Sequence, residues 1–324
     1  MIIVQTPLRV SFFGGGTDFP AYYNAEGGCV LSSSIDKYIF VTIRHRFDDL
    51  IRIGYTKTEI VETVDQVQHE LIREALRKTG ITRGVEITTM GDIPSGSGLG
   101  SSSAVTVGAL HAMYTFNHEM VSQERLADEA CDIEINIVKK PIGKQDQYIA
   151  AFGGLRFIEF RPNETVSSQC VDLESSIDRR LNESLLLFFT GVTRESSTIL
   201  AEQNQNTGNN AAALRTLKQM AYQAKDVLRE GDLQTFGAMM DESWTIKKRL
   251  ANQISNEKIE SLYQKARQAG AWGGKITGAG GGGFLMLVCP PECRKAVRQE
   301  LSDLRELPFE LTKEGTKVIF NHLH

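Results

Sequence analysis

The segment 94–104 joins a predicted strand to a predicted helix through three glycines, and it constrains the fold more than any other part of the chain. An alternating pattern at 85–89 precedes it and an almost wholly apolar run at 105–116 follows. Glycine permits positive φ and close backbone approach. The serines at 101–103 stand at the helix start, where unpaired N–H groups and the positive end of the helix dipole gather. The pattern predicts a phosphate site, although a tight turn before a core helix uses the same residue types.

The loop differs from two common nucleotide-binding patterns. The chain contains no G-x-x-x-x-G-K-[ST], and no G-x-G-x-x-G follows its first predicted strand. These absences exclude a Walker-type loop and a standard dinucleotide fingerprint. We therefore predict that a nucleoside triphosphate binds to a glycine–serine loop of another type.

Composition and charge narrow the class of protein. The 324 residues are 41% hydrophobic and 23% charged, which is typical of a globular protein with room for two domains. A net charge of −4 without a basic block argues against nucleic acid as a partner. No apolar run approaches the ~20 residues of a membrane span, and the first residues lack the features of a signal peptide. We expect a cytoplasmic protein with no membrane partner.

The five cysteines are scattered and odd in number, which favours a reducing compartment over a disulfide framework. Cys289 and Cys293, even when taken with His322 and His324, do not meet the spacing of a zinc site. We therefore interpret these cysteines as structural.

The order of strand and helix patterns predicts an α+β protein of two domains, residues 1–180 and 181–324. Consecutive strands in the first domain favour antiparallel pairing, and the polar segment 163–182 marks the boundary. Strand patterns occur at 2–6, 9–13, 29–35, 38–44, 51–54, 59–64, 185–189 and 284–288, and near Phe309 and Val318. Helical patterns occur at 64–76 with a stop at Gly80, and at 209–229, 233–253, 257–269 and 292–304.

A second glycine cluster, at 14–16, follows the first strands and precedes Thr17 and Asp18. The glycines bring backbone close to a ligand, and a hydroxyl beside a carboxylate suits sugar hydroxyl groups. A helix N-cap at Thr17 or Asp18 explains the same residues equally well.

Two carboxylates stand out between residues 126 and 147. Glu134 lies at the edge of an apolar helical stripe, where carboxylates are rare unless paired or metal-bound. With a serine of 101–103 it would supply the hydroxyl and carboxylate that suit a divalent cation bound with phosphates. Asp146 follows a turn at Gly143, and it either acts on a substrate hydroxyl or caps the next helix.

A third glycine-rich segment, 270–284, contains eight glycines in its fifteen residues. So many glycines are entropically costly and indicate a backbone surface against a ligand, with a flexible lid as the alternative. Arg194, in the segment 191–197, either caps the following helix or grips an anion.

Together these segments resemble the three motifs of the GHMP kinases, the family of galactokinase, homoserine kinase, mevalonate kinase and phosphomevalonate kinase. Residues 94–104 resemble the family's P-x-G-x-G-L-G-S-S-A loop, residues 7–18 its sugar-kinase motif, and residues 275–280 its K-x-T-G-A-G motif. The resemblance implies an N-terminal domain like ribosomal protein S5 domain 2 and a ferredoxin-like C-terminal domain.

The resemblance also implies roles for individual residues. Asp146 matches the catalytic aspartate, Arg9 matches the basic residue that faces it, and Ser102 and Glu134 match the Mg²⁺ ligands. The phosphates of ATP would lie on Pro94, Gly96, Ser97, Gly98, Leu99, Gly100, Ser101, Ser102 and Ser103. Contacts to the substrate would come from Gly15, Gly16, Thr17, Asp18, Gly143, Lys144, Arg194, Gly278, Ala279 and Gly280, with Lys144 and Arg194 as candidates for a distal phosphate.

The glycines at 15 and 16 replace the Glu-His pair of galactokinases, and the segment 11–20 is most similar to the branch of heptose 7-phosphate kinases and fucokinases. This similarity implies ATP-dependent phosphorylation of an anomeric hydroxyl, with a small sugar phosphate as acceptor. The alternatives are a kinase for an unphosphorylated sugar such as fucose or galactose, a catalytically silent sensor of the same fold, and a family decarboxylase. The sugar-type motif disfavours the decarboxylase.

Overall fold

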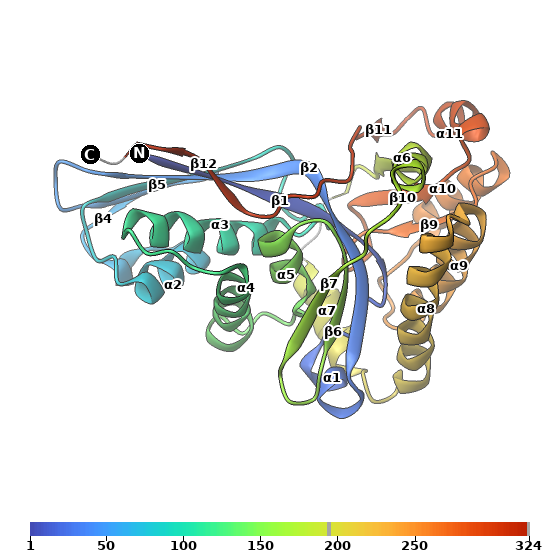
Figure 1. The fold of residues 1–324 in the computed structure, drawn as a ribbon, viewed down its shortest axis with the longest axis horizontal. Coiled ribbons are helices and arrows are strands. Elements are labelled where there is room, and N and C mark those ends of the chain that lie inside the picture. Colours follow the sequence, from blue (N-terminus) through green and yellow to red (C-terminus); the bar gives the residue numbers. More distant parts are fainter. Residues whose placement is uncertain (193–195, 323–324) are drawn as a thin grey trace.

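A computed structural model describes residues 1–192 and 196–322 of the chain. Two sheets, in which most strand pairs are antiparallel, lie side by side. Helices pack mainly on one face of the first sheet and around the second (Figure 1). The first sheet has eight strands and the second has four. The mixture confirms the predicted α+β class.

The first sheet is ordered β12-β1-β2-β5-β3-β4, and β6 and β7 extend it from β2. Its two longest strands each merge two of the predicted runs, because the chain passes through an irregularity without leaving the sheet. One such register shift lies between Pro7 and Leu8, as expected where proline removes a backbone donor. The strands are β1 (Ile2–Phe13), β2 (Gly28–His45), β3 (Ile51–Gly54), β4 (Thr58–Val61), β5 (Val85–Gly91), β6 (Leu155–Phe160), β7 (Val166–Cys170) and β12 (Lys317–Asn321).

The helices associated with this sheet include the apolar helix α3 (Ser101–Phe116), which is buried over most of its length. Helix α2 (Glu70–Thr79) ends at Gly80 in the left-handed conformation, as predicted, but it begins after a separate 3₁₀ turn, η1 (Val64–Gln66). The remaining segments are α1 (Pro20–Glu26), α4 (Gln123–Cys131), the π-helical segment η2 (Asp132–Ile137) and α5 (Gln145–Phe152).

The second sheet is ordered β11-β8-β10-β9, and all its pairs are antiparallel. The two strands predicted at 185–189 and 284–288 are confirmed as β8 (Leu185–Phe189) and β10 (Phe284–Val288). The other strands are β9 (Gly273–Ile276) and β11 (Arg305–Glu306). The helices of this half are α6 (Ser175–Ser184), α7 (Ser196–Gln205), α8 (Ala211–Glu230), α9 (Leu233–Lys247), α10 (Glu257–Gln268), η3 (Pro291–Cys293) and α11 (Arg294–Glu300).

The last strand differs from the sequence-based prediction. Val318 lies in β12, which pairs with β1 of the first sheet rather than with an edge of the second. Near Phe309 the chain forms only a single bridge, from Leu311 to Ile35. By pairing with β1, strand β12 covers an edge that would otherwise offer unpaired backbone groups. The described end of the chain thus belongs to the first sheet, where the His322 amide donates to the Met1 carbonyl at 2.8 Å (Figure 1).

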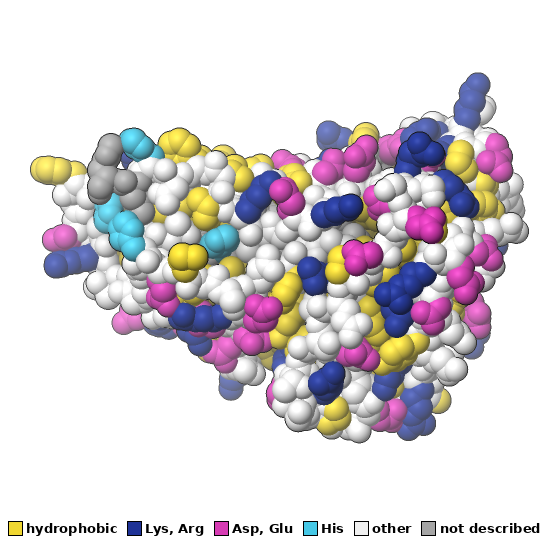
Figure 2. Space-filling view, viewed as in Figure 1, with side chains coloured by type: hydrophobic (Ala, Val, Ile, Leu, Met, Phe, Trp, Pro, Cys, Tyr) yellow, Lys and Arg dark blue, Asp and Glu magenta, His cyan; other side chains and the backbone are white. Residues whose placement is uncertain are grey.

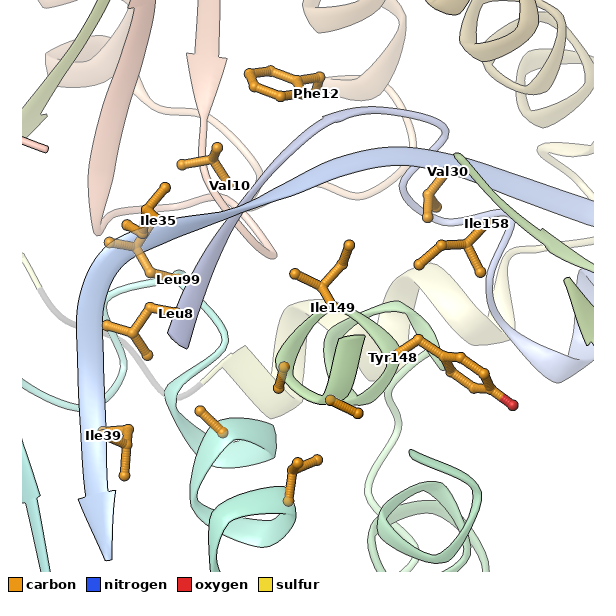
Figure 3. Close-up of a cluster of buried hydrophobic side chains, with 14 of the residues drawn as sticks. Leu8, Val10, Phe12, Val30, Ile35, Ile39, Leu99, Tyr148, Ile149 and Ile158 are labelled. Atoms are coloured by element: carbon orange, nitrogen blue, oxygen red, sulfur yellow. The ribbon is translucent and has the colours of Figure 1, made fainter. Parts of the chain in front are cut away.

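The hydrophobic core reaches directly into the glycine–serine loop. Leu99 is fully buried and lies beside Leu8 and Ile35 in the cluster shown in Figure 3. Burial of a leucine side chain contributes about 1.5–3 kcal/mol. The Arg9 amide also donates to the Leu99 carbonyl at 3.0 Å. This anchor fixes the loop against β1.

The surface carries charges of both signs. Lys and Arg side chains alternate with Asp and Glu over both halves of the face in Figure 2. Among the residues that the structure describes, no helix is both long enough and apolar enough to cross a membrane.

Candidate active site

A cavity of about 700 Å³ lies where the two halves of the molecule meet. Its walls come from β1, the glycine–serine loop, the η2–α5 connection, α7, α9 and the glycine-rich turn after β9. The three sequence motifs and the Glu134–Asp146 region, far apart along the chain, therefore share one site.

The glycine–serine loop needs its glycines for conformation and for contact. Gly96, Gly98 and Gly100 have φ of 75°, 81° and 80°. A Cβ on Gly98 would lie 2.7 Å from the carbonyl oxygen of Thr277, so the third motif packs directly on the loop. No side chain within the described residues caps the start of α3, and its first three residues line the cavity. An uncapped helix start at a cavity suits phosphate oxygens.

The predicted phosphate-binding residues divide into two groups. Pro94, Ser97 and Leu99 lie outside the cavity lining, and Leu99 acts as the hydrophobic anchor. The residues that line the cavity are Gly96, Gly98, Gly100, Ser101, Ser102 and Ser103. The Ser101 hydroxyl is buried and has no hydrogen-bond partner in the described part of the chain, which leaves it available to a ligand.

Arg9 and Asp146 are brought together from β1 and α5. Arg9 Nε donates to Asp146 Oδ1 and Nη2 donates to Oδ2, both at 2.7 Å. Arg9 Nη1 also donates to the Gly98 carbonyl at 2.6 Å. A bidentate charge-assisted pair fixes the carboxylate plane. The same guanidinium therefore connects the carboxylate to the glycine–serine loop.

Asp18 forms a second carboxylate site on the same wall. The Gly16 amide donates to Oδ1 and the Gln145 side-chain amide donates to Oδ2, both at 2.9 Å. Burial raises the pKa of Asp18, and the nearby charge of Asp146 adds to this effect. Ser11 Oγ and Gln145 Oε1, which belong to cavity-lining residues, are buried without partners among the described residues. These groups are suited to a ligand with several hydroxyls.

The first glycine cluster supports this wall without lining the cavity. Thr17 is fully buried, and its hydroxyl donates to the carbonyls of Gly14 and Cys29 at 2.8 Å and accepts from the Cys29 amide at 3.0 Å. The expected sugar contact of Thr17 is therefore replaced by a structural role. Gly15 and Gly16 also lie outside the lining.

Glu134 lies in the π-helical segment η2, a local irregularity that the periodicity did not indicate. Ser102 Oγ donates to Glu134 Oε2 and Gln147 Nε2 donates to Oε1, both at 3.1 Å. Burial raises the pKa of Glu134, while Lys140 opposes this effect. Lys140 Nζ lies 3.1 Å from Ser102 Oγ. A buried carboxylate beside a hydroxyl is a donor pair that suits Mg²⁺ bound with phosphate oxygens.

Of the two residues predicted to bind a distal phosphate, the structure describes only Lys144, and it does not bring this residue to the cavity. Lys144 forms an ion pair with Glu164 and lies 4.9 Å from the centre of the Tyr23 ring, outside the lining. Arg194 falls outside the described residues. Gly143 does line the cavity, and a Cβ there would lie 2.0 Å from Asp18 Oδ2. Gly278, Ala279 and Gly280 line it as well.

Sequence reasoning assigned no role to several polar residues that line the cavity: Ser11, Lys140, Gln145, Lys247 and Lys275. Lys247 carried a usable signal, because it continues the buried face of α9 that Phe236 and Met240 begin. A lysine on an apolar stripe is unusual. Burial lowers the pKa of Lys247 to about 8, and Arg9 acts in the same direction.

The models of the GHMP kinases N terminal domain and of the GHMP kinases C terminal match residues 58–154 and 224–305. The chain is 32% identical to D-glycero-alpha-D-manno-heptose 7-phosphate kinase of Campylobacter jejuni, over 98% of both chains.

Solved structures show the same likeness. A D-glycero-D-manno-heptose 1-phosphate kinase from Bacteroides thetaiotaomicron matches with a TM-score of 0.83 and 27% identity over the full length of both chains. Galactokinase of Lactococcus lactis shares the fold, with a TM-score of 0.78 and 19% identity over 98% of this chain and 94% of that one. The chain thus belongs to the GHMP kinase family and is a phosphotransferase that uses ATP and an alcohol acceptor.

Proposed function

We propose that the protein transfers the γ-phosphate of ATP to the anomeric hydroxyl of D-glycero-D-manno-heptose 7-phosphate, giving the 1,7-bisphosphate. The observation that carries this proposal is the Arg9–Asp146 pair, which stands beside a helix start suited to phosphate. The sugar is inferred from the similarity to a heptose 7-phosphate kinase over nearly the whole chain. Such a reaction would serve nucleotide-activated heptose synthesis for surface polysaccharide, in the cytoplasm.

The carboxylate of Asp146 would accept or orient the proton of the attacking hydroxyl. Arg9 keeps this carboxylate in one orientation and places positive charge next to the carbonyl of Gly98 in the phosphate loop. Phosphoryl transfer depends mainly on positioning and on stabilising charge. Both tasks fall to a single arginine that contacts the acid and the loop.

Ser102 and Glu134 are the residues that would hold Mg²⁺. Their hydroxyl and carboxylate fit the ion's preference for a few protein oxygens together with phosphate oxygens and water. Bound there, the ion would neutralise charge on the transferring phosphate. The fully buried Glu134 carboxylate also gains a compensating charge when a cation is next to it.

Asp18, Gln145 and Ser11 would receive the hydroxyls of the sugar. Asp18 is held by two donors, and the unpartnered Ser11 Oγ and Gln145 Oε1 lie in the same wall. The backbone at 278–280 lines the same cavity.

The test is the identity of the product. ATP, Mg²⁺ and the protein are incubated separately with heptose 7-phosphate, heptose 1-phosphate, fucose and galactose, and products are identified by mass spectrometry and ³¹P NMR. We expect a bisphosphate with a new anomeric phosphate from the 7-phosphate. Preferred turnover of fucose or galactose would replace the proposal with a kinase for unphosphorylated sugars. ATP binding without any turnover would favour the sensor.

A further inference from the structure

Four basic side chains among the described residues line the cavity: Arg9, Lys140, Lys247 and Lys275. Two of them have carboxylate partners. Arg9 pairs with Asp146 at 2.7 Å, and Lys140 pairs with Glu70 at 3.1 Å. Within residues 1–192 and 196–322, neither Lys247 nor Lys275 forms an ion pair.

Lys247 ends helix α9 and is only 7% exposed. Its Nζ donates to the Gly278 carbonyl at 2.6 Å. Lys275, in β9, is 3% exposed and donates to the Phe12 carbonyl at 3.0 Å. An ammonium group has three donors, so each lysine retains donors beyond these contacts. Buried cations of this kind are costly unless an anion joins them.

Two observations put the two lysines among the residues that would contact the acceptor. Asp18 and Asp146, which line the same cavity, are the acidic groups whose charges act on Lys247. Ser11, next to the Phe12 carbonyl that holds Lys275, is 6% exposed and has an unpartnered hydroxyl within the described chain. An anion here would meet the side chains of both lysines.

The nucleotide side has its own cation. Lys140 contacts Ser102 Oγ at 3.1 Å, in the first turn of α3 and beside Glu134. The phosphate loop and this helix start already provide donors for a triphosphate. The unpaired charge of Lys247 and Lys275 is therefore best matched by an anionic group on the other substrate.

We propose that Lys247, supported by Lys275, binds the phosphate group carried by the acceptor sugar and sets the preference for a phosphorylated over a neutral acceptor. This inference rests on the proposed function for its acceptor, a sugar phosphate. It replaces Lys144, which lies outside the cavity, as the residue for the distal phosphate.

The experiment compares Lys247→Met and Lys247→Arg with Lys248→Met. Lys248 is the next residue along, but it pairs with Glu260 at 2.8 Å and lies outside the cavity lining, so it is a matched control. Three quantities are measured for each variant: kcat/KM for heptose 7-phosphate, kcat/KM for the unphosphorylated heptose, and the Kd of a nonhydrolysable ATP analogue. Thermal melting checks that each variant is folded.

Loss of a buried charged contact to phosphate predicts that Lys247→Met lowers kcat/KM for the 7-phosphate by at least about thirtyfold. In Lys247→Met, kcat/KM for the unphosphorylated heptose and the Kd of the nucleotide analogue should stay within about twofold of the wild-type values. All three quantities should stay within about twofold of wild type in Lys248→Met. Lys247→Arg should recover part of the loss, because it restores the positive charge. Equal losses for both sugars, or a loss of nucleotide affinity alone, would overturn the proposal.

A binding measurement separates this inference from the proposed function. Inorganic phosphate is titrated by calorimetry into protein already saturated with the ATP analogue. We expect binding to the wild type and to Lys248→Met, and no binding to Lys247→Met. If the wild type binds phosphate in this way but does not phosphorylate the 7-phosphate, the proposed function fails while the anion site stands. Absence of phosphate binding to the wild type refutes the site itself.

Discussion

Arg9 holds both carboxylate oxygens of Asp146 at 2.7 Å while its third nitrogen donor reaches the carbonyl of Gly98 at 2.6 Å. One side chain thus connects strand β1, helix α5 and the glycine–serine loop. Because a guanidinium is planar and presents its donors in a fixed fork, this connection is rigid. The Asp146 carboxylate and the loop are therefore held in one relative position.

Asp146→Asn is expected to lower kcat by about 10²- to 10⁴-fold, the range for loss of a group that acts on a proton. Asparagine keeps the size of the side chain, but its single amide oxygen can accept only one of the two hydrogen bonds that Arg9 donates to Asp146. Nucleotide affinity should remain, because the phosphate loop is intact. A coupled ADP assay and calorimetry with a nonhydrolysable analogue measure the two quantities.

The matched control is Asp48→Asn. Asp48 is held by Arg46 in the same bidentate manner, with both distances 2.6 Å, but on the surface and away from the cavity. Full turnover by this control is expected. Full turnover by Asp146→Asn would remove Asp146 from the chemistry.

Glu134→Gln should raise the Mg²⁺ concentration needed for half-maximal activity by about tenfold or more, because a neutral amide binds the ion less well than a carboxylate. It should not lower the melting temperature. Burial raises the pKa of Glu134, so its charged form is disfavoured in the folded protein. A Mg²⁺ titration of the rate and thermal melting give the two readings.

Glu74→Gln should show the opposite behaviour. Glu74 is also buried, and although burial acts to raise its pKa, hydrogen bonds from Arg73 and Arg77 hold that pKa below the usual value. Its charge therefore stabilises the fold, and its replacement should lower the melting temperature without changing the Mg²⁺ requirement. An unchanged Mg²⁺ requirement in Glu134→Gln would argue against the metal site.

Gly98→Ala is expected to raise KM for ATP and to destabilise the protein by at least about 1 kcal/mol. The residue has φ of 81°, and a Cβ would lie 2.7 Å from the Thr277 carbonyl oxygen, so loop and third motif must separate. Gly208→Ala is the control, because a Cβ there meets nothing within 4 Å. Kinetics over a range of ATP concentrations and denaturant unfolding test the prediction. Equal KM values for ATP and equal stabilities in Gly98→Ala and Gly208→Ala would contradict this prediction.

The affinity for a phosphorylated acceptor should fall at alkaline pH. Burial lowers the pKa of Lys247 to about 8, and the charge of Arg9 adds to this, while Asp18 and Asp146 oppose it. Lys275, itself buried, has its pKa lowered well below the usual value, in part by Lys247. Since the ammonium form binds the anion, the Kd should rise above about pH 8 as Lys247 loses its proton, approaching about tenfold per pH unit.

The Lys247→Arg variant tests the origin of this pH dependence. A guanidinium stays charged throughout the range, so the alkaline loss of affinity should disappear. Phosphate titrations from pH 6.5 to pH 10, with the nucleotide analogue bound, provide the measurement. The same alkaline loss in Lys247→Arg would assign the titration to another group.

Local patterns predicted the parts of the site that are made of backbone. A strand, three glycines and a serine-rich helix start are neighbours along the chain, and their conformations follow from short-range sterics, so residues 94–104 could be assigned from sequence. The cavity confirms that Gly98, Ser102, Glu134 and Asp146 line one site. The π-helical turn that carries Glu134 was not predicted, because it interrupts the 3.6-residue period.

Direction of side chains and pairing of distant segments were decided only by the tertiary structure. Thr17 and Lys144 stand in or near the motifs, yet Thr17 bonds to backbone and Lys144 to Glu164, since the nearest partner in space comes from elsewhere in the chain. Lys247 belongs to no motif and enters the site because α9 packs beside β9. The sequence by itself determined which glycine–serine backbone would line the cavity. Long-range packing determined which charges surround it, because Coulomb interactions depend on distance in space and not along the chain.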